Sequence, residues 1–288
     1  MQVTPALVKE LRERTGAGMM DCKKALVDSA GDVDAAAELL RKAGQAKADK
    51  KSARVAAEGQ VLVLADQAAG RYAIAEVNTE TDFAANDASF REFADAVGKV
   101  ILERQPKTLD ELMRLDAGGR TVEEARQALV AKIGENIAVR RFDVIASSGT
   151  VGSYVHMNRI GTLVELEGGN ADLARDLAMQ VAATSPRHVS VEDVPADELA
   201  KEREILTAQA GQEGKPPEIV AKMVEGRLRK HFEEVTLVGQ QFVKDPDKRV
   251  RDLLKASGAS VKRFLRFEVG EGLDKKRGDF AQEVAALL

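Results

Sequence analysis

The segment Glu76–Asn86 places a carboxylate and a large aromatic ring next to each other, as Asp82 and Phe83, in a short polar stretch. Apolar residues 73–77 precede this stretch and predict a strand, and apolar residues with helical spacing follow it. No histidine or cysteine lies nearby in the sequence to turn the carboxylate into a catalyst. We therefore expect a wedge that inserts into a partner rather than a site that turns over a substrate.

A second interpretation of the same two residues is purely local. Asp82 could cap a turn, and Phe83 could fold back as a hydrophobic staple onto the helix that begins near residue 86 or 87. A staple needs an apolar residue immediately before the N-cap, where Ala85 or Asn86 stands, so Phe83 comes two or three positions too early. The spacing leaves both interpretations open.

The sequence carries no recognisable site for covalent catalysis, a metal or a nucleotide. Gly211–Lys215 fails as a phosphate-binding loop because Pro216 and Pro217 follow where a helix must begin. Gly16-Ala17-Gly18 lacks the third glycine of a dinucleotide fingerprint, and no Gly-x-Ser-x-Gly motif is present. The candidate soft ligands lack metal-ligand spacing: Cys22, His156, His188 and His231. We expect no cofactor, no metal and no covalent enzyme activity.

The composition is that of an ordinary globular protein of 288 residues, with 44% hydrophobic residues, 31% charged residues and a net charge of −4. Nucleic-acid binders usually show a strong basic excess, and sheet-based RNA readers need more aromatic residues than the 4% found here, so nucleic-acid binding is not expected. The single cysteine, Cys22, fits a reducing compartment. Without a signal core or an apolar run of ~18 residues, we expect a cytoplasmic protein with no membrane partner.

The pattern of helices and strands predicts an α+β fold in four parts. The parts are an N-terminal three-helix bundle with a basic linker at 1–55, the first half of a core at 56–146, its second half at 147–272, and a C-terminal module at 273–288. Thr4-Pro5 opens the first helix, and Asp32 caps the third. The basic stretch 47–54 lacks strong apolar periodicity, so we expect a linker, either helical or irregular, that serves as a solvated connector, with a phosphate-binding patch as the alternative.

The two halves of the core repeat the same order of elements. Strands are predicted at 60–65, 71–77 and 136–145 in the first half and at 149–155, 161–166 and 261–269 in the second. Arg71–Val77 matches Arg159–Leu166, and Val139–Val144 resembles Phe264–Val269. We therefore predict an internal duplication, in which each half is a three-stranded sheet covered by helices.

An antiparallel helical hairpin is predicted at 195–232, inserted into the second half with a turn at 211–217. Apolar residues of the two arms are expected to face each other: Leu199, Ile205 and Leu206 on the first arm, and Ile219, Met223 and Leu228 on the second. A short apolar helix is predicted at 280–288. It can pack on its own body or on a partner, and both interpretations stay open.

Stretches in order along the whole chain resemble the elongation factor Ts family. Leu11–Leu26 is similar to the N-terminal signature of that family, and Glu76–Asn86 is similar to its second signature, built around Thr-Asp-Phe. Further similar stretches are 131–136, 152–156, 159–161, 222–227 and 266–272. The N-terminal bundle resembles ubiquitin-associated (UBA-like) domains.

The resemblance implies a guanine-nucleotide exchange factor for elongation factor Tu, the GTPase that delivers aminoacyl-tRNA. The loop Thr81–Ala84 would enter that partner near its Mg²⁺ and phosphate site. Phe83 would insert between two helices of the GTPase, and Asp82 would disturb the hydrogen bonds that hold the Mg²⁺ ligands. Thr81 and Ala84 would complete the loop.

The same resemblance implies a wider interface in a one-to-one complex with the GDP-bound GTPase. Its other contacts would be Met19, Met20 and Lys23 in the bundle, Ile133 in the first half, and His156 and Val243 in the second. The C-terminal helix would also reach the partner. From helical packing alone, one of the two methionines is expected in the bundle's own core.

Three positions depart from the family pattern. Thr79 stands for the usual Cys or Ser, Ala84 for the usual Val, and Gln241 for a Pro that often precedes Phe242. Ala84 removes an apolar contact beside the ring of Phe83. Two other functions stay open: a binding module or chaperone that holds the same GTPase without exchange, and an RNA-binding translation protein that uses the basic linker and the bundle.

Overall fold

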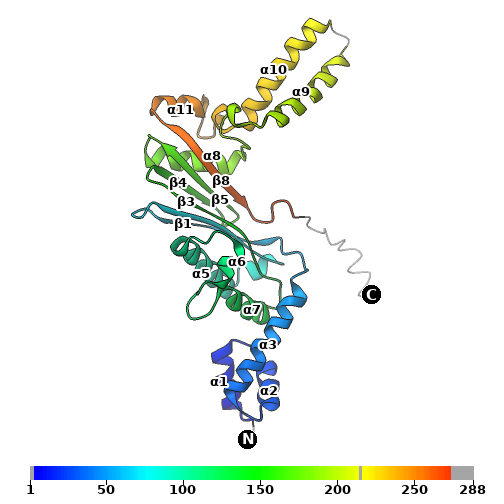
Figure 1. Cartoon of the computed structure of the whole chain (residues 1–288), viewed down its shortest axis with the longest axis vertical. Helices are drawn as coiled ribbons and strands as arrows, with labels where there is room; N and C mark the ends of the chain where they lie inside the picture. Colours follow the sequence, from blue (N-terminus) through cyan, green and yellow to red (C-terminus); the bar gives the residue numbers. More distant parts are fainter. Residues whose placement is uncertain (1–2, 214–215, 274–288) are drawn as a thin grey trace. The chain divides into compact units, whose positions relative to one another are not determined.

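The computed structural model describes residues 3–213 and 216–273, and its fold class is α+β, as predicted (Figure 1). The described chain forms two compact units. Unit 1 contains residues 3–66, 73–144 and 267–273, and unit 2 contains residues 67–72, 145–213 and 216–266. Among the helices of these ranges, none combines the length and the apolar character that a bilayer crossing requires.

The N-terminal bundle of unit 1 consists of three helices, α1 (Pro5–Thr15), α2 (Met19–Asp28) and α3 (Val33–Lys51). The predicted caps are confirmed: the Thr4 hydroxyl accepts a hydrogen bond from Leu7 N, and the Asp32 carboxylate accepts from the amides that open α3. The bundle core is small: Leu11, Cys22, Ala25, Leu26 and Ala36.

Helix α3 continues through residues 47–51 of the predicted linker. The exposure of Lys47, Asp49 and Lys50 fits a solvated stretch, whereas the burial of Ala48 was not predicted. Alanine and lysine favour helix, and small residues on one face let α3 pack closely on another helix, α7 (Val122–Ile133). Ala48 is fully buried, and a Cβ placed on Gly44 would lie 3.5 Å from the Cβ of Ala131. The Lys51 ammonium donates a hydrogen bond to the carbonyl of Gly134, just beyond α7.

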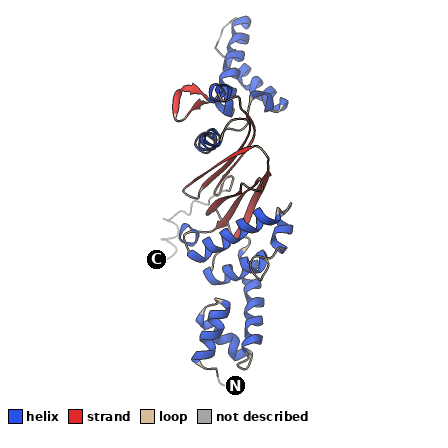
Figure 2. Cartoon of the chain, turned by 90° about the vertical axis from the view of Figure 1, so that its left-hand side faces the viewer, coloured by secondary structure: helices blue, strands red, loops and turns tan. Residues whose placement is uncertain are grey.

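The first sheet has the strand order β1-β2-β3. Its strands are β1 (Glu58–Asp66), β2 (Arg71–Thr79) and β3 (Ala138–Ala146). The helices that follow β2 are α4 (Asp82–Ala85), α5 (Ala88–Arg104), α6 (Leu109–Arg114) and α7. The predicted apolar face of α5 is confirmed, since Phe90, Phe93 and Val97 are buried in the core with residues of the central strand β2. Figure 2 shows helices of this unit lying against its sheet.

The second sheet has the strand order β4-β5-β8. Its strands are β4 (Thr150–His156), β5 (Ile160–Glu167) and β8 (Ser260–Glu268), and helix α8 (Ala171–Thr184) packs on it. Strands β4 and β5 pair antiparallel with Thr150 opposite Leu166 and His156 opposite Ile160. Met157 and Asn158 form the connecting turn, both with positive φ, which is the backbone that a tight hairpin demands.

The predicted helical hairpin of unit 2 is α9 (Ala196–Gly211) and α10 (Pro217–Val235). Leu206 and Leu228 pack in its core as expected, but Ile205 and Ile219 are exposed, so their predicted facing contact is wrong. Val224 and Phe232 occupy the core instead, because they lie four residues before and four residues after Leu228, on the same face of α10. The predicted helix at 280–288 lies outside the described residues.

The remaining described elements were not predicted. They are the 3₁₀ turns Val191–Asp193 and Leu237–Gly239, the strands β6 (Gln241–Phe242) and β7 (Asp245–Arg249), and the helix α11 (Val250–Ala256). β6 and β7 form a small antiparallel pair. The sequence of β7 is charged and contains a proline, so it carries no alternation that would indicate a strand.

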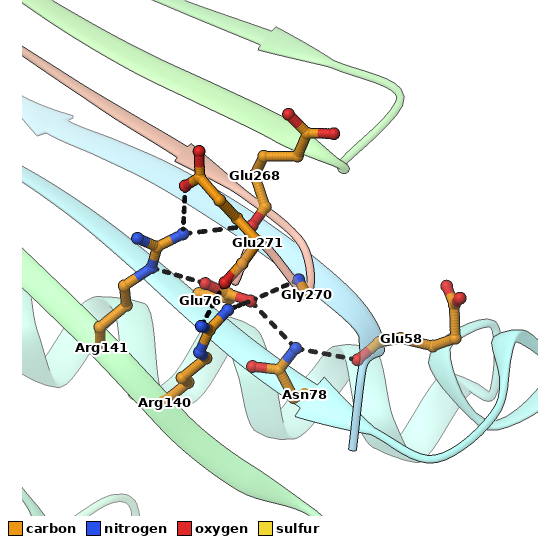
Figure 3. Close-up of polar contacts among 8 residues, drawn as sticks. All are labelled: Glu58, Glu76, Asn78, Arg140, Arg141, Glu268, Gly270 and Glu271. Carbon is orange, nitrogen blue, oxygen red and sulfur yellow. Dashed lines mark hydrogen bonds and ion pairs between the residues drawn. The ribbon is translucent and has the colours of Figure 1, made fainter. Parts of the chain in front are cut away.

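A fully buried glutamate on β2, Glu76, ties together three parts of unit 1 (Figure 3). Its carboxylate accepts hydrogen bonds from Arg140 (2.9 Å) and Arg141 (2.6 Å) on β3 and from the amide of Gly270 (2.8 Å). Gly270 has φ +74, and a Cβ there would lie 2.4 Å from the carbonyl oxygen of Ala57, so only glycine fits. Burial alone would raise the pKa of Glu76, but these hydrogen bonds outweigh burial and lower it.

A second buried glutamate, Glu165 on β5, repeats this arrangement in unit 2. It accepts hydrogen bonds from Lys262 (3.0 Å) and Arg263 (2.7 Å) on the closing strand β8. Burial would raise its pKa, but hydrogen bonds from Ser147, Arg263 and Lys262 outweigh burial and lower the pKa to about 2. Each sheet therefore pairs a buried carboxylate on its second strand with two consecutive cations on its closing strand.

Replacement of Glu165 by glutamine is expected to reduce stability at neutral pH and to lose that effect in acid. A folded-state pKa below the ordinary 4.5 means that the carboxylate stabilises unit 2 fully above pH 4.5, and that this contribution fades as the pH falls toward about 2. Because Lys262 and Arg263 are half-exposed and screened by solvent, we expect a difference of roughly 1–2 kcal/mol at neutral pH. Urea titrations between pH 7 and 3 measure it through Tyr72 and Tyr154, both of which lie in unit 2. A difference that is constant over this pH range contradicts the prediction.

Gly152 on β4 is expected to tolerate no side chain. A Cβ there would lie 2.1 Å from the carbonyl carbon of Ala174 on α8, so Gly152→Ala should lower the free energy of unfolding by about 2 kcal/mol or more. Gly226 lies inside α10 with open space around its Cβ position, and Gly226→Ala should raise helix stability by about 0.5–1 kcal/mol. Urea titration followed by tyrosine fluorescence and circular dichroism compares the two variants. A Gly152→Ala midpoint equal to that of the parent chain would refute the close packing.

Candidate functional site

Phe83 stands on the surface of unit 1, with 85% of its side chain exposed. The alternative in which the ring folds back onto the following helix is therefore wrong. The segment is also more ordered than the predicted loop: Asp82–Ala85 forms the one-turn helix α4, and Asp87 separately caps α5. Asp82 is also exposed, so this single turn presents a carboxylate and a phenyl group at consecutive positions.

Thr81 begins α4 from the N-cap position. Its hydroxyl accepts a hydrogen bond from Ala84 N at 3.2 Å, whereas the alternative of Asp82 as the cap is not what the structure shows. The same Thr81 hydroxyl donates to the carboxylate of Glu135 at 2.7 Å. Glu135 also accepts from Thr81 N (2.9 Å) and from the Thr79 hydroxyl (2.9 Å). The entry into α4 is thus fixed by one carboxylate from the end of α7.

A second contact joins the same two chain segments, with the carboxylate now on the segment before α4 and the amide donor on the segment after α7. The carboxylate of Glu80 accepts a hydrogen bond from Asn136 N at 2.6 Å and forms an ion pair with Arg54 at 3.5 Å. The Asn136 side chain donates to the carbonyl of Arg54 at 2.7 Å. Residues 79–81, 135–136 and the chain just after α3 therefore hold one another.

The C-terminal end of α4 is fixed by contacts with the interior of unit 1. Ala84 and Ala85 are buried, and the buried Gln60 side chain on β1 donates a hydrogen bond to the carbonyl of Ala85 at 2.9 Å. The Asn86 side chain donates to the carbonyl of Asp82 at 2.9 Å. Ala84 therefore faces the interior of unit 1, and the exposed surface of this turn is Asp82 and Phe83.

The bundle candidates share one exposed face of α2. Met19 and Met20 are 59% and 74% exposed, and Lys23 is exposed one turn later. The expectation that one of these methionines belongs to the core is wrong, because Leu11, Cys22 and Leu26 already fill it. Two thioethers in water beside an ammonium group are a favourable surface for a partner.

The other three candidates lie on separate elements. Ile133 ends α7 and is partly buried against the core of unit 1. His156 ends β4 in unit 2, where its Nδ1 lies 3.2 Å from the Tyr154 hydroxyl, and the neighbouring Met157 is exposed. Val243 is exposed between β6 and β7, and its amide donates to the fully buried Gln180 side chain at 2.8 Å.

Sequence reasoning missed the residues that position the candidates. Glu135, Gln60 and Gln180 carry no motif of their own, and each lies at least 25 residues from the atoms that it holds. Only Glu135 falls within a stretch noted for its family resemblance, and that stretch gave no reason to place its carboxylate against Thr81. In the described part of the chain, no cluster of three or more His, Cys, Asp or Glu side chains could hold a metal ion.

Comparison with known proteins settles the family. A sequence model described as Elongation factor TS matches residues 80–271, which include α4, Glu135 and both buried glutamate clusters apart from Glu76. The chain belongs to the elongation factor Ts family. It is 56% identical over 288 residues to Elongation factor Ts of Thioalkalivibrio sulfidiphilus, with 99% of this chain and 98% of that protein covered.

Two further relatives give the same result. Elongation factor Ts of Halorhodospira halophila is 56% identical over 286 residues, and that of Methylococcus capsulatus is 54% identical over 288 residues. In each comparison the match covers 99% of this chain and 98% of the relative. The similarity therefore covers the N-terminal bundle, both sheets and the hairpin, and the chain is a translation elongation factor by family.

Removal of the Thr81 hydroxyl is expected to loosen α4. Thr81→Ala loses the cap, which is worth about 1 kcal/mol, so the amides of Ala84, Ala85 and Asn86 should exchange with solvent roughly fivefold faster. Thr81→Ser keeps the hydroxyl and should retain the slower exchange. Hydrogen exchange followed by mass spectrometry checks both variants. Equal exchange in the alanine and serine variants would show that the hydroxyl does not hold this helix.

Proposed function

We propose that this member of the elongation factor Ts family is a guanine-nucleotide exchange factor for elongation factor Tu, and that the one-turn helix α4 promotes GDP release. The observation that supports this proposal is the 85% exposure of Phe83 on a turn fixed at both ends by polar contacts. Because this apolar ring is held in water by its own domain, its burial by a partner lowers the free energy of the system. Membership of the family implies the identity of that partner.

The carboxylate and the ring have separate roles in the proposed mechanism. In P-loop GTPases, Mg²⁺ bridges the nucleotide phosphates to the protein. Asp82 competes for the hydrogen bonds that orient the Mg²⁺ ligands, and Phe83 inserts between two helices and holds the opened pocket apart. Once the phosphate charge is less compensated, GDP leaves faster. Thr81 and Ala84 complete the turn from its cap and its buried side.

Energetics require a wider interface than this one turn. Burial of a phenyl ring contributes roughly 1.5–3 kcal/mol, and each tenfold acceleration requires about 1.4 kcal/mol of preferential stabilisation of the open state. The ring alone therefore accounts for one or two powers of ten. The remainder is assigned to the other proposed contacts, namely Met19, Met20, Lys23, Ile133, His156 and Val243.

The proposed complex contains one copy of each protein. The factor itself carries out no covalent chemistry, and it acts by binding the open state of the GTPase more tightly than the GDP-bound state. The reaction that it accelerates is a dissociation, so it needs an exposed, rigid surface and no nucleophile or acid–base pair of its own.

The finer description of the fold is also a proposal: the two sheets derive from one duplicated unit. Both have the same strand order and a buried glutamate paired with consecutive cations. These pairs align Val139-Arg140-Arg141-Phe142 with Val261-Lys262-Arg263-Phe264, three residues earlier on β8 than the sequence comparison with Phe264–Val269 suggested. The division of the chain at residues 55, 146 and 272 stays a prediction.

Loss of the Phe83 ring is expected to remove most exchange activity. Phe83→Ala should slow the release of fluorescent GDP from elongation factor Tu by about tenfold to hundredfold at substoichiometric factor, because the buried phenyl contribution is lost. Ile219→Ala serves as the matched control, since it also truncates an exposed apolar side chain and belongs to no proposed contact.

Three outcomes separate this proposal from its alternatives. Unchanged acceleration by Phe83→Ala rejects the role of the ring. A parent chain that binds the GTPase but does not accelerate GDP release favours a non-exchanging binding module or chaperone. Salt-sensitive binding to RNA, with no effect on GDP release, favours an RNA-binding translation protein.

A further inference from the structure

Glu135 accepts three hydrogen bonds from the residues that lead into α4, and it does so with both carboxylate oxygens. One oxygen accepts from the Thr79 hydroxyl and from Thr81 N, each at 2.9 Å, and the other accepts from the Thr81 hydroxyl at 2.7 Å. We propose that Glu135 is a positioning residue for nucleotide exchange: it holds α4 in the geometry that presents Asp82 and Phe83, without touching the partner. This inference rests on the proposed function.

The hydrogen-bond pattern requires an acceptor at this position. A hydroxyl has one proton to donate and lone pairs with which to accept. The Thr81 hydroxyl donates its proton to Glu135, which leaves a lone pair directed at Ala84 N and makes the cap of α4. A carboxylate, which only accepts, fixes this direction. A glutamine amide has a single acceptor oxygen, so its NH₂ group would replace the other oxygen and face one or two of the three donors.

The turn needs such an external anchor because it is too short to be stable by itself. A helix of four residues forms few internal hydrogen bonds and does not pass the nucleation barrier alone. Glu135 supplies the anchor from the end of α7, which is packed into the core by Leu129 and Val130. Gly134, with φ +88, ends α7 and turns the chain so that residue 135 meets residues 79–81.

Anchoring affects exchange through the population of the competent turn. When α4 opens, the ring of Phe83 samples other positions. The apparent affinity for the open GTPase is then the intrinsic affinity multiplied by the fraction of molecules in which the turn is formed. A hydrogen bond to a charged group is worth about 1.5–3 kcal/mol. Loss of this acceptor set should therefore slow exchange by about tenfold or more, although Glu135 contributes no contact of its own.

The test compares Glu135→Gln with Glu123→Gln in the full chain. Glu123 is a matched control on α7: its carboxylate also accepts three hydrogen bonds, from Arg126 Nε (2.8 Å), Arg126 Nη2 (2.6 Å) and Gln127 Nε2 (2.7 Å), but none from α4. Both variants are assayed for GDP release from elongation factor Tu, for hydrogen exchange of residues 82–86 and for thermal unfolding. We expect Glu135→Gln alone to slow GDP release by about tenfold or more and to speed hydrogen exchange in α4.

A double-mutant cycle with Phe83→Ala separates positioning from an independent contact. If Glu135 acts through the ring, Glu135→Gln should have little further effect on GDP release in the Phe83→Ala background. Fully additive effects overturn the proposal, as does a Glu135→Gln variant no slower than Glu123→Gln. In both of these cases a strong effect of Phe83→Ala leaves the proposed function standing, whereas an inactive parent chain or a fully active Phe83→Ala variant rejects that function itself.

A second variant keeps the test decisive if Glu135→Gln does not fold. Thr79→Val removes one of the three donors with a side chain of the same shape and leaves the carboxylate in place. It should slow GDP release less than Glu135→Gln but measurably, by about threefold to tenfold. A Thr79→Val variant with the parent rate and parent hydrogen exchange in α4 overturns the proposal.

Discussion

The proposed activity depends on one constraint: a phenyl ring has to stay in water on a helix of a single turn. The hydrophobic effect favours burial of the ring in its own domain, and a helix of four residues has too few internal hydrogen bonds to oppose this. The protein meets this constraint with polar contacts beneath the turn. Glu135 fixes the entry, Gln60 fixes the exit, and Ala84 and Ala85 occupy the buried side of the turn.

Buried polar side chains have the same role elsewhere in the two units. Glu76 joins β2, β3 and the turn at Gly270, and Glu165 joins β5 and β8. Gln180 holds the amide of Val243, another proposed contact. An unpaired buried carboxylate or amide is strongly unfavourable, so each of these groups permits one arrangement of the segments around it. Two of the surfaces proposed to meet a partner, α4 and Val243, are thus held in part by buried amide side chains, Gln60 and Gln180.

Sequence reasoning succeeded where local chemistry decides the structure. The caps at Thr4 and Asp32, the apolar face of α5 and the two arms of the hairpin follow from residue type and spacing. In these cases the signal and the structure involve residues within about one or two helical turns of each other. For Phe83 the spacing left the staple and the exposed wedge both open, and only the structure decides for exposure.

It failed where contacts distant in sequence decide. The end of α3 looked solvated because its alanines and lysines show no strong apolar period, yet Ala48 packs in the core, close to α7. Ile205 was predicted in the hairpin core but is exposed, because the crossing of α9 and α10 decides which residues of each helix face the other. The position of the Glu135 carboxylate depends on the fold between residues 81 and 135, and neither local segment encodes it.

The unbroken course of α3 has a practical consequence for dissecting this protein. The helix begins inside the N-terminal bundle, packs on α7 and ends against the carbonyl that precedes Glu135. One continuous helix therefore belongs both to the bundle and to the layer of helices that follows β2. A truncated chain that starts after residue 46 would lack most of α3, including the residues around Gly44 that cover α7. Any defect in such a fragment would mix loss of the bundle with damage to the remaining scaffold.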